Sequence, residues 1–150
     1  MTSRRVAASV GILTATAIVV SVGATGASAT KAPLTLNFTN KMDTFAPIDV
    51  PPTGPSAGDQ FLISSHVVAG GSGRTAATCQ LITLSRGGIR LCEIDFMLSG
   101  GTITTRGTTD TAATPTHLVV TGGSGKYVGA QGSGTLTPTA TGSVVTLSLH

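Results

Sequence analysis

The chain offers few side chains that could transfer a proton or attack a substrate. His66 and His117 are candidates for general acid–base work, and His150 is the last residue of the sequence. Strand alternation predicts that His66 lies on an outer face and that His117 begins a strand near the rim of the fold. No cluster of His, Cys and Asp has metal-site spacing, and no Ser–His–Asp arrangement is readable. The sequence therefore predicts no metal, no other cofactor and no conventional catalytic triad.

Two glycine-rich segments invite a comparison with phosphate-binding loops. Residues 67–74 read VVAGGSGR, and residues 119–126 read VVTGGSGK. A P-loop requires a glycine five positions before its Gly-Lys pair and a Ser or Thr after the Lys, but Val120 and Tyr127 occupy these positions. A dinucleotide-binding turn requires a glycine where this chain has Val128. The spacing argues against phosphate binding, and glycines with positive φ in strand-ending turns explain both segments.

Cys79 and Cys92 are the only two cysteines, and an even count in an exported protein favours a disulfide. They lie on either side of a predicted turn at residues 85–88, so a hairpin centred there brings them face to face. Closing a loop of this size stabilises a fold by about 3 kcal/mol. If both cysteines point inward, Glu93 and Asp95 face outward, where they form a solvated or subunit-facing surface rather than an acid–base pair.

Short runs rich in Val, Ile, Thr and Leu alternate with clusters of Gly, Pro and Ser after residue 30. No helical apolar period lasts for three turns, and the pattern is typical of a sandwich or barrel. Short connections predict antiparallel neighbours, and an even number of strands closes into an up-and-down barrel without exposed edges. We therefore predict an all-β fold, an eight-stranded antiparallel β-barrel, with strands at residues 34–39, 60–69, 74–84, 89–98, 102–106, 116–121, 134–139 and 143–149.

One connection in this scheme is long. Residues 40–59 contain Pro47, Pro51, Pro52 and Pro55, and we expect them to form a loop across the barrel or its mouth. The loop either covers apolar surface or serves as a lid.

The first 29 residues have the layout of a secretory signal peptide. Arg4 and Arg5 precede an uncharged apolar run, and Ala-Ser-Ala at positions 27–29 provides a cleavage site. A membrane anchor is the alternative, although Ser, Thr and Gly dilute the apolar run. We expect residues 1–29 to be removed, leaving a secreted, extracellular β-barrel domain, residues 30–150, without a membrane segment. Loss of both arginines lowers the net charge from +3 to +1, and the scattered basic residues that remain argue against a nucleic-acid partner.

Several segments carry a family likeness. Residues 118–132, LVVTGGSGKYVGAQG, resemble the glycine-rich segment shared by allene oxide cyclases and dirigent proteins. Residues 58–59 are similar to the Gly-Asp that opens the second strand in both groups. Residues 76–82 resemble the cysteine-bearing strand of the plant cyclases, and residues 101–107 resemble their Gly-x-Ile-x-x-x-Gly hairpin. The motif positions in this chain are Gly58, Asp59, Gly122, Gly123, Gly125, Tyr127, Gly129 and Gly132.

This resemblance implies a calycin-like barrel that assembles as a homo-oligomer, a trimer or dimer, and it implies two activities. Allene oxide cyclases close a fatty-acid epoxide into a cyclopentenone inside the barrel, whereas dirigent proteins guide the coupling of phenoxy radicals made by another enzyme. Both families rely on a carboxylate near the first strand. Residues 34–39 contain none, and Asp43 lies beyond that predicted strand. Ser65 stands where the plant cyclases carry an Asn.

Alternation along the strands predicts an apolar lumen with a few hydroxyl groups, suited to a small hydrophobic or phenolic ligand. Ser65 and Thr105 are the candidate catalytic residues, because hydroxyl donors in a dry site stabilise developing negative charge. We predict a cofactor-free cyclase or isomerase that works by shaping its substrate. A dirigent-like protein and a non-catalytic ligand-binding or structural barrel are the alternatives. The predicted ligand pocket consists of Phe61, Ile63, Val67, Leu81, Ile94, Phe96 and Ile103.

Overall fold

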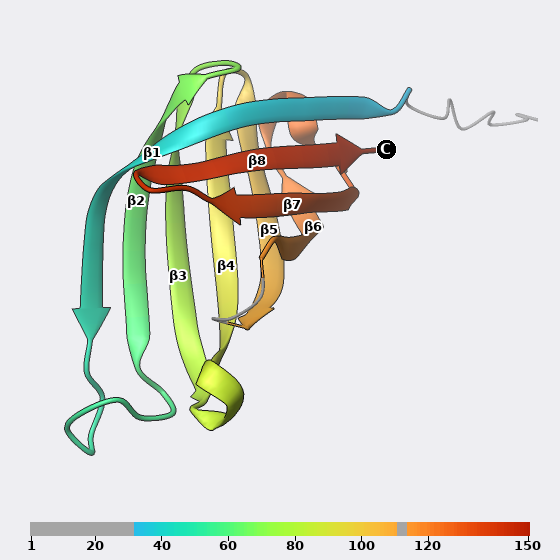
Figure 1. Cartoon of the computed structure of the whole chain (residues 1–150). Helices are drawn as coiled ribbons and strands as arrows, with labels where there is room; N and C mark the ends of the chain where they lie inside the picture. The colour runs from blue at the N-terminus through green and yellow to red at the C-terminus, as the bar shows by residue number, and fades with distance from the viewer. Residues whose placement is uncertain (1–31, 111–113) are drawn as a thin grey trace, which may run out of the picture.

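The computed structural model describes residues 32–110 and 114–150, which form a closed barrel of eight antiparallel strands (Figure 1). Each strand pairs with its neighbours in sequence and β8 pairs with β1, which confirms the predicted up-and-down barrel. The predicted leader, residues 1–29, lies outside the described residues. The elements are β1 (Leu34–Ile48), β2 (Gln60–Ala69), β3 (Gly73–Thr83), β4 (Ile89–Leu98), β5 (Gly101–Asp110), β6 (Thr116–Gly123), β7 (Gly132–Pro138) and β8 (Gly142–Leu149), with 3-10 turns η1 (Ser85–Gly87) and η2 (Gly125–Tyr127).

Strand β1 is the main correction to the predicted elements. We expected it to end at residue 39, yet it continues to Ile48 and contains Pro47. It pairs with β8 over residues 34–41 and with β2 over residues 39–48. The backbone N–H of Met42 still donates to Thr141, and from Asp43 onward β1 pairs only with β2. An unpaired edge tolerates proline, which has no backbone N–H to donate. A register shift between Met42 and Thr44 leaves Asp43 at a bulge within the strand, rather than beyond it.

The two halves of β1 belong to two different parts of the barrel wall. In Figure 1, β7, β8 and the first half of β1 run across the direction of β2–β5, and β1 bends between them. The bulge at Asp43 lies in the second half of the strand, and bulges increase local bending and twist. The long strand thus closes the barrel by serving both parts. No helix among residues 32–110 and 114–150 is long and apolar enough to cross a bilayer.

Cys79 on β3 and Cys92 on β4 are directly opposite in the strand register and form a disulfide, with their Cα atoms 4.0 Å apart. This confirms the predicted pairing and fixes which faces of the two strands point inward. Ala77 and Ile94 occupy the same inward face, again as a cross-strand pair. Because side chains alternate along strands, the rest of the interior follows from this one pair.

Side chains fill the end of the barrel that carries η2. The rings of Phe38 and Phe96 meet edge to face there, with centroids 5.3 Å apart and an interplanar angle of 74°. Tyr127 of η2 is buried against the same cluster. The members without measurable exposure are Phe96, Ile103, Thr105, Val145 and Leu147. We call this packed cluster the apolar plug. The cavity described below lies at the opposite end of the barrel.

The glycine-rich motif around η2 allows close backbone contact at the plugged end. Gly125 has φ +59°, and a Cβ there would lie 2.2 Å from the carbonyl oxygen of Gly100. Gly132 has φ +145°, and a Cβ there would lie 1.9 Å from the carbonyl oxygen of Ser148. Side chains larger than hydrogen would therefore force the strands apart. The motif residues secure the barrel closure, as expected for glycines in strand-ending turns.

The loop between β1 and β2, residues 49–59, is held by the buried carboxylate of Asp59. Oδ1 accepts hydrogen bonds from the Val50 backbone N–H (3.0 Å) and the Ser56 hydroxyl (3.1 Å), and Oδ2 accepts one from the Ser56 backbone N–H (2.9 Å). Backbone bonds join Gly58 and Asp59 to Leu81 of β3, each 2.8 Å long. The loop is thus tied to the outer rim of β3, and it contributes no residue to the cavity lining described below.

Asp59→Asn is expected to destabilise the protein at neutral pH, and the difference from the wild type should shrink in acid. Backbone N–H groups of Ser56 and Val50 hold the pKa of Asp59 below its ordinary value of 3.8. A depressed pKa in the folded state contributes stability above the unfolded pKa, and this contribution is lost as pH falls through the folded value. Urea unfolding at pH 7 and at several values below about pH 4 measures the difference. Asp49→Asn is the control, because Asp49 accepts one exposed bond from Gly54. A difference that stays constant with pH would contradict this account.

Candidate ligand-binding site

The open end of the barrel contains a cavity of about 360 Å³. Ligand sites commonly measure about 300–1,000 Å³ and combine an apolar wall with a few polar groups, and this cavity fits the lower end of that range. Apolar side chains from β1, β2, β4 and β7 form much of its wall, together with the disulfide. The lining residues are Asn40, Met42, Phe45, Ile63, Ser65, Thr75, Ala77, Cys79, Arg90, Cys92, Ile94, Thr109, Asp110, Thr114, Thr116, Leu136, Pro138, Gly142 and Ser143.

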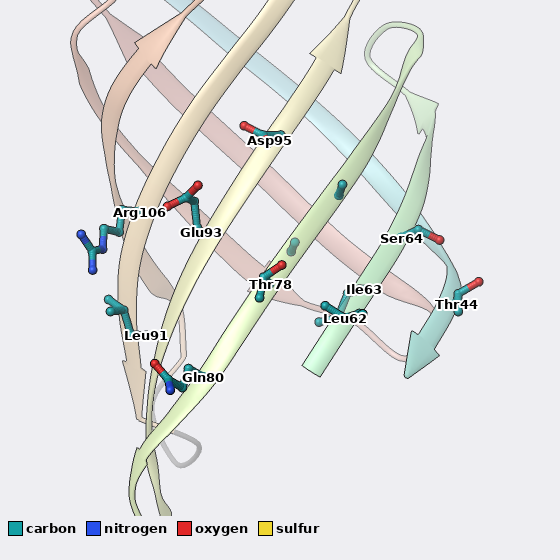
Figure 2. Close-up of a pocket in the computed structure, with 12 residues that line it drawn as sticks. Thr44, Leu62, Ile63, Ser64, Thr78, Gln80, Leu91, Glu93, Asp95 and Arg106 are labelled. Atoms are coloured by element: carbon teal, nitrogen blue, oxygen red, sulfur yellow. The ribbon is translucent and has the colours of Figure 1, made fainter. Parts of the chain in front are cut away.

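A second hollow, of about 610 Å³, lies on the outer wall across β2–β5 (Figure 2). It is larger but shallower, and the outward side chains of the strands line it, among them Glu93 and Arg106, which are opposite each other in register. Asp95 lies on the same wall, where the Thr104 hydroxyl donates to its carboxylate over 2.6 Å. Both carboxylates thus face outward, as predicted. A ligand there would remain largely in solvent, so the inner cavity is the better candidate site.

The structure places the seven residues of the predicted ligand pocket at different depths in the barrel. All seven predicted residues lie on strand faces that alternate toward the interior, but of these only Ile63 and Ile94 line the cavity. Phe96 and Ile103 belong to the apolar plug. Phe61 and Val67 pack against the buried hydrophobic cluster and Leu81 is buried on β3, and none of the three lines the cavity. Alternation identifies which side chains point inward, but it does not show how much of the interior they fill.

The two hydroxyl residues considered for catalysis are placed differently. Ser65 is buried in the cavity wall, opposite Thr75 on β3 and Met42 on β1. Thr105 belongs to the fully buried plug, and its hydroxyl donates to the carbonyl oxygen of Ile94 over 3.3 Å. The structure therefore brings Ser65 to the cavity and leaves Thr105 outside it.

Three polar side-chain atoms in the cavity wall are buried and have no hydrogen-bond partner among the described residues. They are Asn40 Oδ1, Thr75 Oγ1 and Arg90 Nε. Native proteins pair nearly all buried polar atoms, with protein groups, water or ligands. Three such atoms around one cavity therefore indicate a site that is completed by something other than the protein itself.

The sequence analysis missed these three residues, although alternation could have found two of them. Arg90 lies two positions before Cys92, and Thr75 lies two positions before Ala77, on faces already assigned to the interior. The predicted interior contained apolar side chains and the hydroxyls of Ser65 and Thr105, and it omitted Thr75 and Arg90 on the same faces. Asn40 was placed in the predicted loop because the predicted strand ended at residue 39, whereas β1 continues to Ile48.

Arg90 stands on an aromatic platform beside the cavity. Its guanidinium lies 4.6 Å from the ring centroid of Phe61. The Phe61 ring in turn stacks on Phe45, with centroids 5.6 Å apart and an interplanar angle of 24°. A cation–π contact attracts the guanidinium to the ring and leaves its N–H groups free of that interaction.

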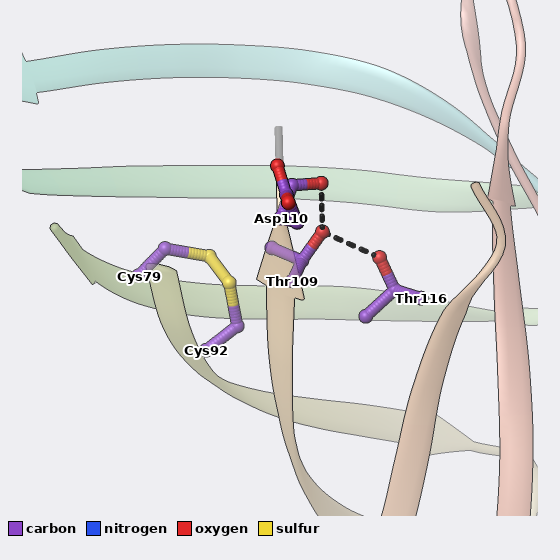
Figure 3. Close-up of a disulfide and its surroundings, with 5 residues drawn as sticks. All are labelled: Cys79, Cys92, Thr109, Asp110 and Thr116. Atoms are coloured by element: carbon purple, nitrogen blue, oxygen red, sulfur yellow. Dashed lines mark hydrogen bonds between the residues drawn. A yellow bond between two sulfur atoms is a disulfide. The ribbon is translucent and has the colours of Figure 1, made fainter. Parts of the chain in front are cut away.

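The rim of the cavity beside the disulfide carries hydroxyl groups (Figure 3). Thr116 donates to the hydroxyl of Thr109 over 3.0 Å, and Thr109 donates to the backbone oxygen of Asp110 over 3.2 Å. These bonds join the end of β5 to the start of β6. Residues 111–113 between them lie outside the described residues.

The histidines lie away from the cavity lining. His66 is on the outer wall, as alternation predicted, and its Nδ1 lies 2.6 Å from Oδ1 of Asp43 at the bulge of β1. Both side chains are 44% exposed, which leaves the pair in contact with solvent. His117 is also exposed, and His150 is joined to Gln131 through backbone bonds. No group of three His, Cys, Asp or Glu residues within the described ranges could hold a metal ion.

No protein-family model matches the chain, and no curated protein matches its sequence. Solved structures do match. A pyocyanin demethylase superposes with a TM-score of 0.70 and 26% identity, covering 78% of this chain and 100% of its own. AbnU, an exo-specific intermolecular Diels–Alderase, superposes with a TM-score of 0.59 and 16% identity, covering 79% of this chain and 98% of its own. The Diels–Alderase AbmU from Streptomyces koyangensis superposes with a TM-score of 0.59 and 17% identity, covering 79% of this chain and 63% of its own. These enzymes share the barrel fold of this chain.

Proposed function

We propose that this chain is a secreted barrel protein that binds one small hydrophobic or aromatic molecule in its cavity and converts it without a cofactor, as a cyclase or isomerase. The observation that carries the proposal is the 360 Å³ cavity, whose apolar wall contains buried polar atoms without partners among the described residues. A wall made only for packing would pair or exclude such atoms. A ligand site keeps a few of them to orient its ligand.

The structures with the same fold support a role in small-molecule chemistry. They are named as a pyocyanin demethylase and as Diels–Alderases, and these names describe reactions of small organic molecules. The glycine motif at residues 118–132 resembles that of allene oxide cyclases, and it adds support for a cyclisation. The disulfide and the leader-like residues 1–29 support export, since disulfides persist in oxidising compartments.

The contribution of the protein to such a reaction is to shape its substrate. An apolar wall excludes water and holds a flexible molecule in one conformation, and correct orientation removes up to about 7–11 kcal/mol of barrier in the best cases. The hydroxyl of Ser65 lies in the wall and is suited to donate to an oxygen that gains negative charge. Thr105 has no such part, because its hydroxyl is already donated to Ile94.

Filling the cavity should abolish ligand binding. Ala77 lines the cavity, whereas its neighbour Ala76 is exposed on the outer wall, so Ala77→Phe and Ala76→Phe form a matched pair. We expect a panel of fatty acids, phenols and polyketides to contain a ligand that raises the melting temperature of the wild type, because a ligand at a hundred times its Kd stabilises by about 2.7 kcal/mol. Ala77→Phe should weaken this ligand at least tenfold and Ala76→Phe should not. Both residues border the outer hollow, so loss of binding in Ala76→Phe, alone or together with Ala77→Phe, would move the site there and contradict the proposal.

Catalysis is separated from binding by following the ligands of this panel that can cyclise. We expect faster conversion with an enantiomeric excess, measured by chiral chromatography, and a rate up to about tenfold lower in Ser65→Ala, which loses one hydrogen-bond donor. Racemic product at the background rate from every bound ligand would leave a binding protein only. Selectivity that requires an added oxidase would indicate dirigent-like guidance instead.

A further inference from the structure

We infer that the molecule bound in this cavity is an organic anion, with a carboxylate or ionised hydroxyl paired to Arg90 and a flat apolar body. This inference rests on the proposed function and adds a substrate class to the same cavity. It starts from Arg90 Nε, which is buried in the wall without a hydrogen-bond partner among the described residues. Arg90 also forms no ion pair with a described residue. Its guanidinium makes a cation–π contact with the Phe61 ring. Arginine remains protonated at any ordinary pH, so a permanent positive charge borders the cavity.

The aromatic platform decides how this charge is presented. The guanidinium carbon lies 4.6 Å from the Phe61 ring centroid, and a cation–π contact of this kind uses none of the N–H donors. An anionic oxygen in the plane of the guanidinium would receive charge-assisted hydrogen bonds, which are about twice as strong as neutral ones. Phe45, which lines the cavity and stacks on Phe61, offers an apolar surface for an unsaturated or aromatic body.

The other polar groups define the far end of the ligand. Thr75 faces the cavity from β3, six residues along the strand from Leu81, which is the register partner of Arg90. Asn40 approaches from β1, and the side chains of Asn40 and Thr75 are only 3% and 6% exposed. Their unpartnered oxygens, one an amide acceptor and one a hydroxyl, suit a hydroxyl or N–H group on the ligand. The cavity therefore favours a molecule with an anionic oxygen at one end and a hydrogen-bond donor at the other.

Asp110 is the one other charged side chain of the cavity lining in the described part of the chain. It ends β5 one position beyond Thr109, the register partner of Arg90; it takes part in contacts of its own and forms no ion pair with Arg90. Its negative charge opposes an anion placed near it, so the anionic group of the ligand must lie closer to Arg90 than to Asp110.

The test uses two probes that share one ring system. Naphthalene-2-carboxylate carries the anion and 2-naphthalenemethanol does not, and calorimetric titration measures both on the full barrel, residues 30–150. We expect the carboxylate to bind roughly tenfold to a hundredfold more tightly than the alcohol, as a charge-assisted bond implies. Arg90→Gln should remove this preference by weakening the carboxylate alone, and Arg90→Lys should keep part of it. Arg106→Gln, an exposed arginine on the outer wall, should leave both affinities unchanged.

The outcomes separate this inference from the proposed function. If both probes bind the wild type with equal affinity and neither binds Ala77→Phe, the cavity remains the ligand site but the inference of an anionic ligand is wrong. A preference that survives in Arg90→Gln, or that disappears in Arg106→Gln, would also overturn the role of Arg90. Binding of neither probe to the wild type would contradict the inference, whereas the ligand panel decides the proposed function independently. If Arg90→Gln does not fold, Arg90→Lys supplies the answer, because lysine keeps the charge without the planar donors and should reduce the preference, whereas an unchanged preference would overturn the role of Arg90.

Discussion

Phe96→Ala is expected to lower the free energy of unfolding by about 3–5 kcal/mol, since truncating a buried Phe removes both its burial and its packing. Phe96 has no exposed surface, and its ring meets Phe38 edge to face at the centre of the apolar plug. A domain of this size is stable by only about 5–15 kcal/mol, so the variant should be close to unfolding at 37 °C. Urea denaturation followed by circular dichroism measures the change.

The neighbouring residue provides the control for this prediction. Met97 is 42% exposed on the outer wall, and Met97→Ala should change stability by about 0.5 kcal/mol or less. A loss below about 1 kcal/mol in Phe96→Ala would mean that the plug can collapse around the missing ring. In that case the plugged end would be softer than the complete burial of its members indicates.

Replacing both cysteines by alanine should lower the free energy of unfolding by about 3 kcal/mol. The disulfide joins residues 13 positions apart in sequence and restricts the unfolded chain, which is the main source of its contribution. Thiol titration of the unfolded wild type without reductant should find no free thiol, because both cysteines are paired. Wild type reduced with dithiothreitol should have the same melting temperature as the double variant. Equal stability of the reduced and oxidised proteins would contradict a stabilising role for this bond.

The barrel and its inward faces could be predicted because each depends on a local pattern. One pair of cysteines on either side of a turn determined the register of β3 and β4, and alternation then determined the neighbouring faces. β1 could not be predicted in full because its proline is acceptable only at an edge, and the edge exists only because β8 ends its pairing at Lys41. Where this pairing ends is a property of the closed barrel, and the sequence of β1 alone does not reveal it.

The candidate site was predicted less well for a related reason. Phe96 and Ile94 are two residues apart on the same face of β4, yet one fills the plug and the other lines the cavity. The difference is set by side chains from β1, β6 and β8, which the sequence does not place at a given depth. Arg90 was missed because a charged residue at a strand start is usually solvated. Only its position over Phe61 and beside the cavity gives it a functional meaning.

The apolar plug has a consequence for the kinetics of any reaction in this barrel. Since side chains fill the end that carries η2, the substrate and product of the proposed reaction share the cavity at the other end. A new substrate enters only after the previous product has departed, so product competes directly with substrate for the vacant barrel. For the proposed reaction we therefore expect competitive inhibition by product, measured as a rise in the apparent KM when product is added.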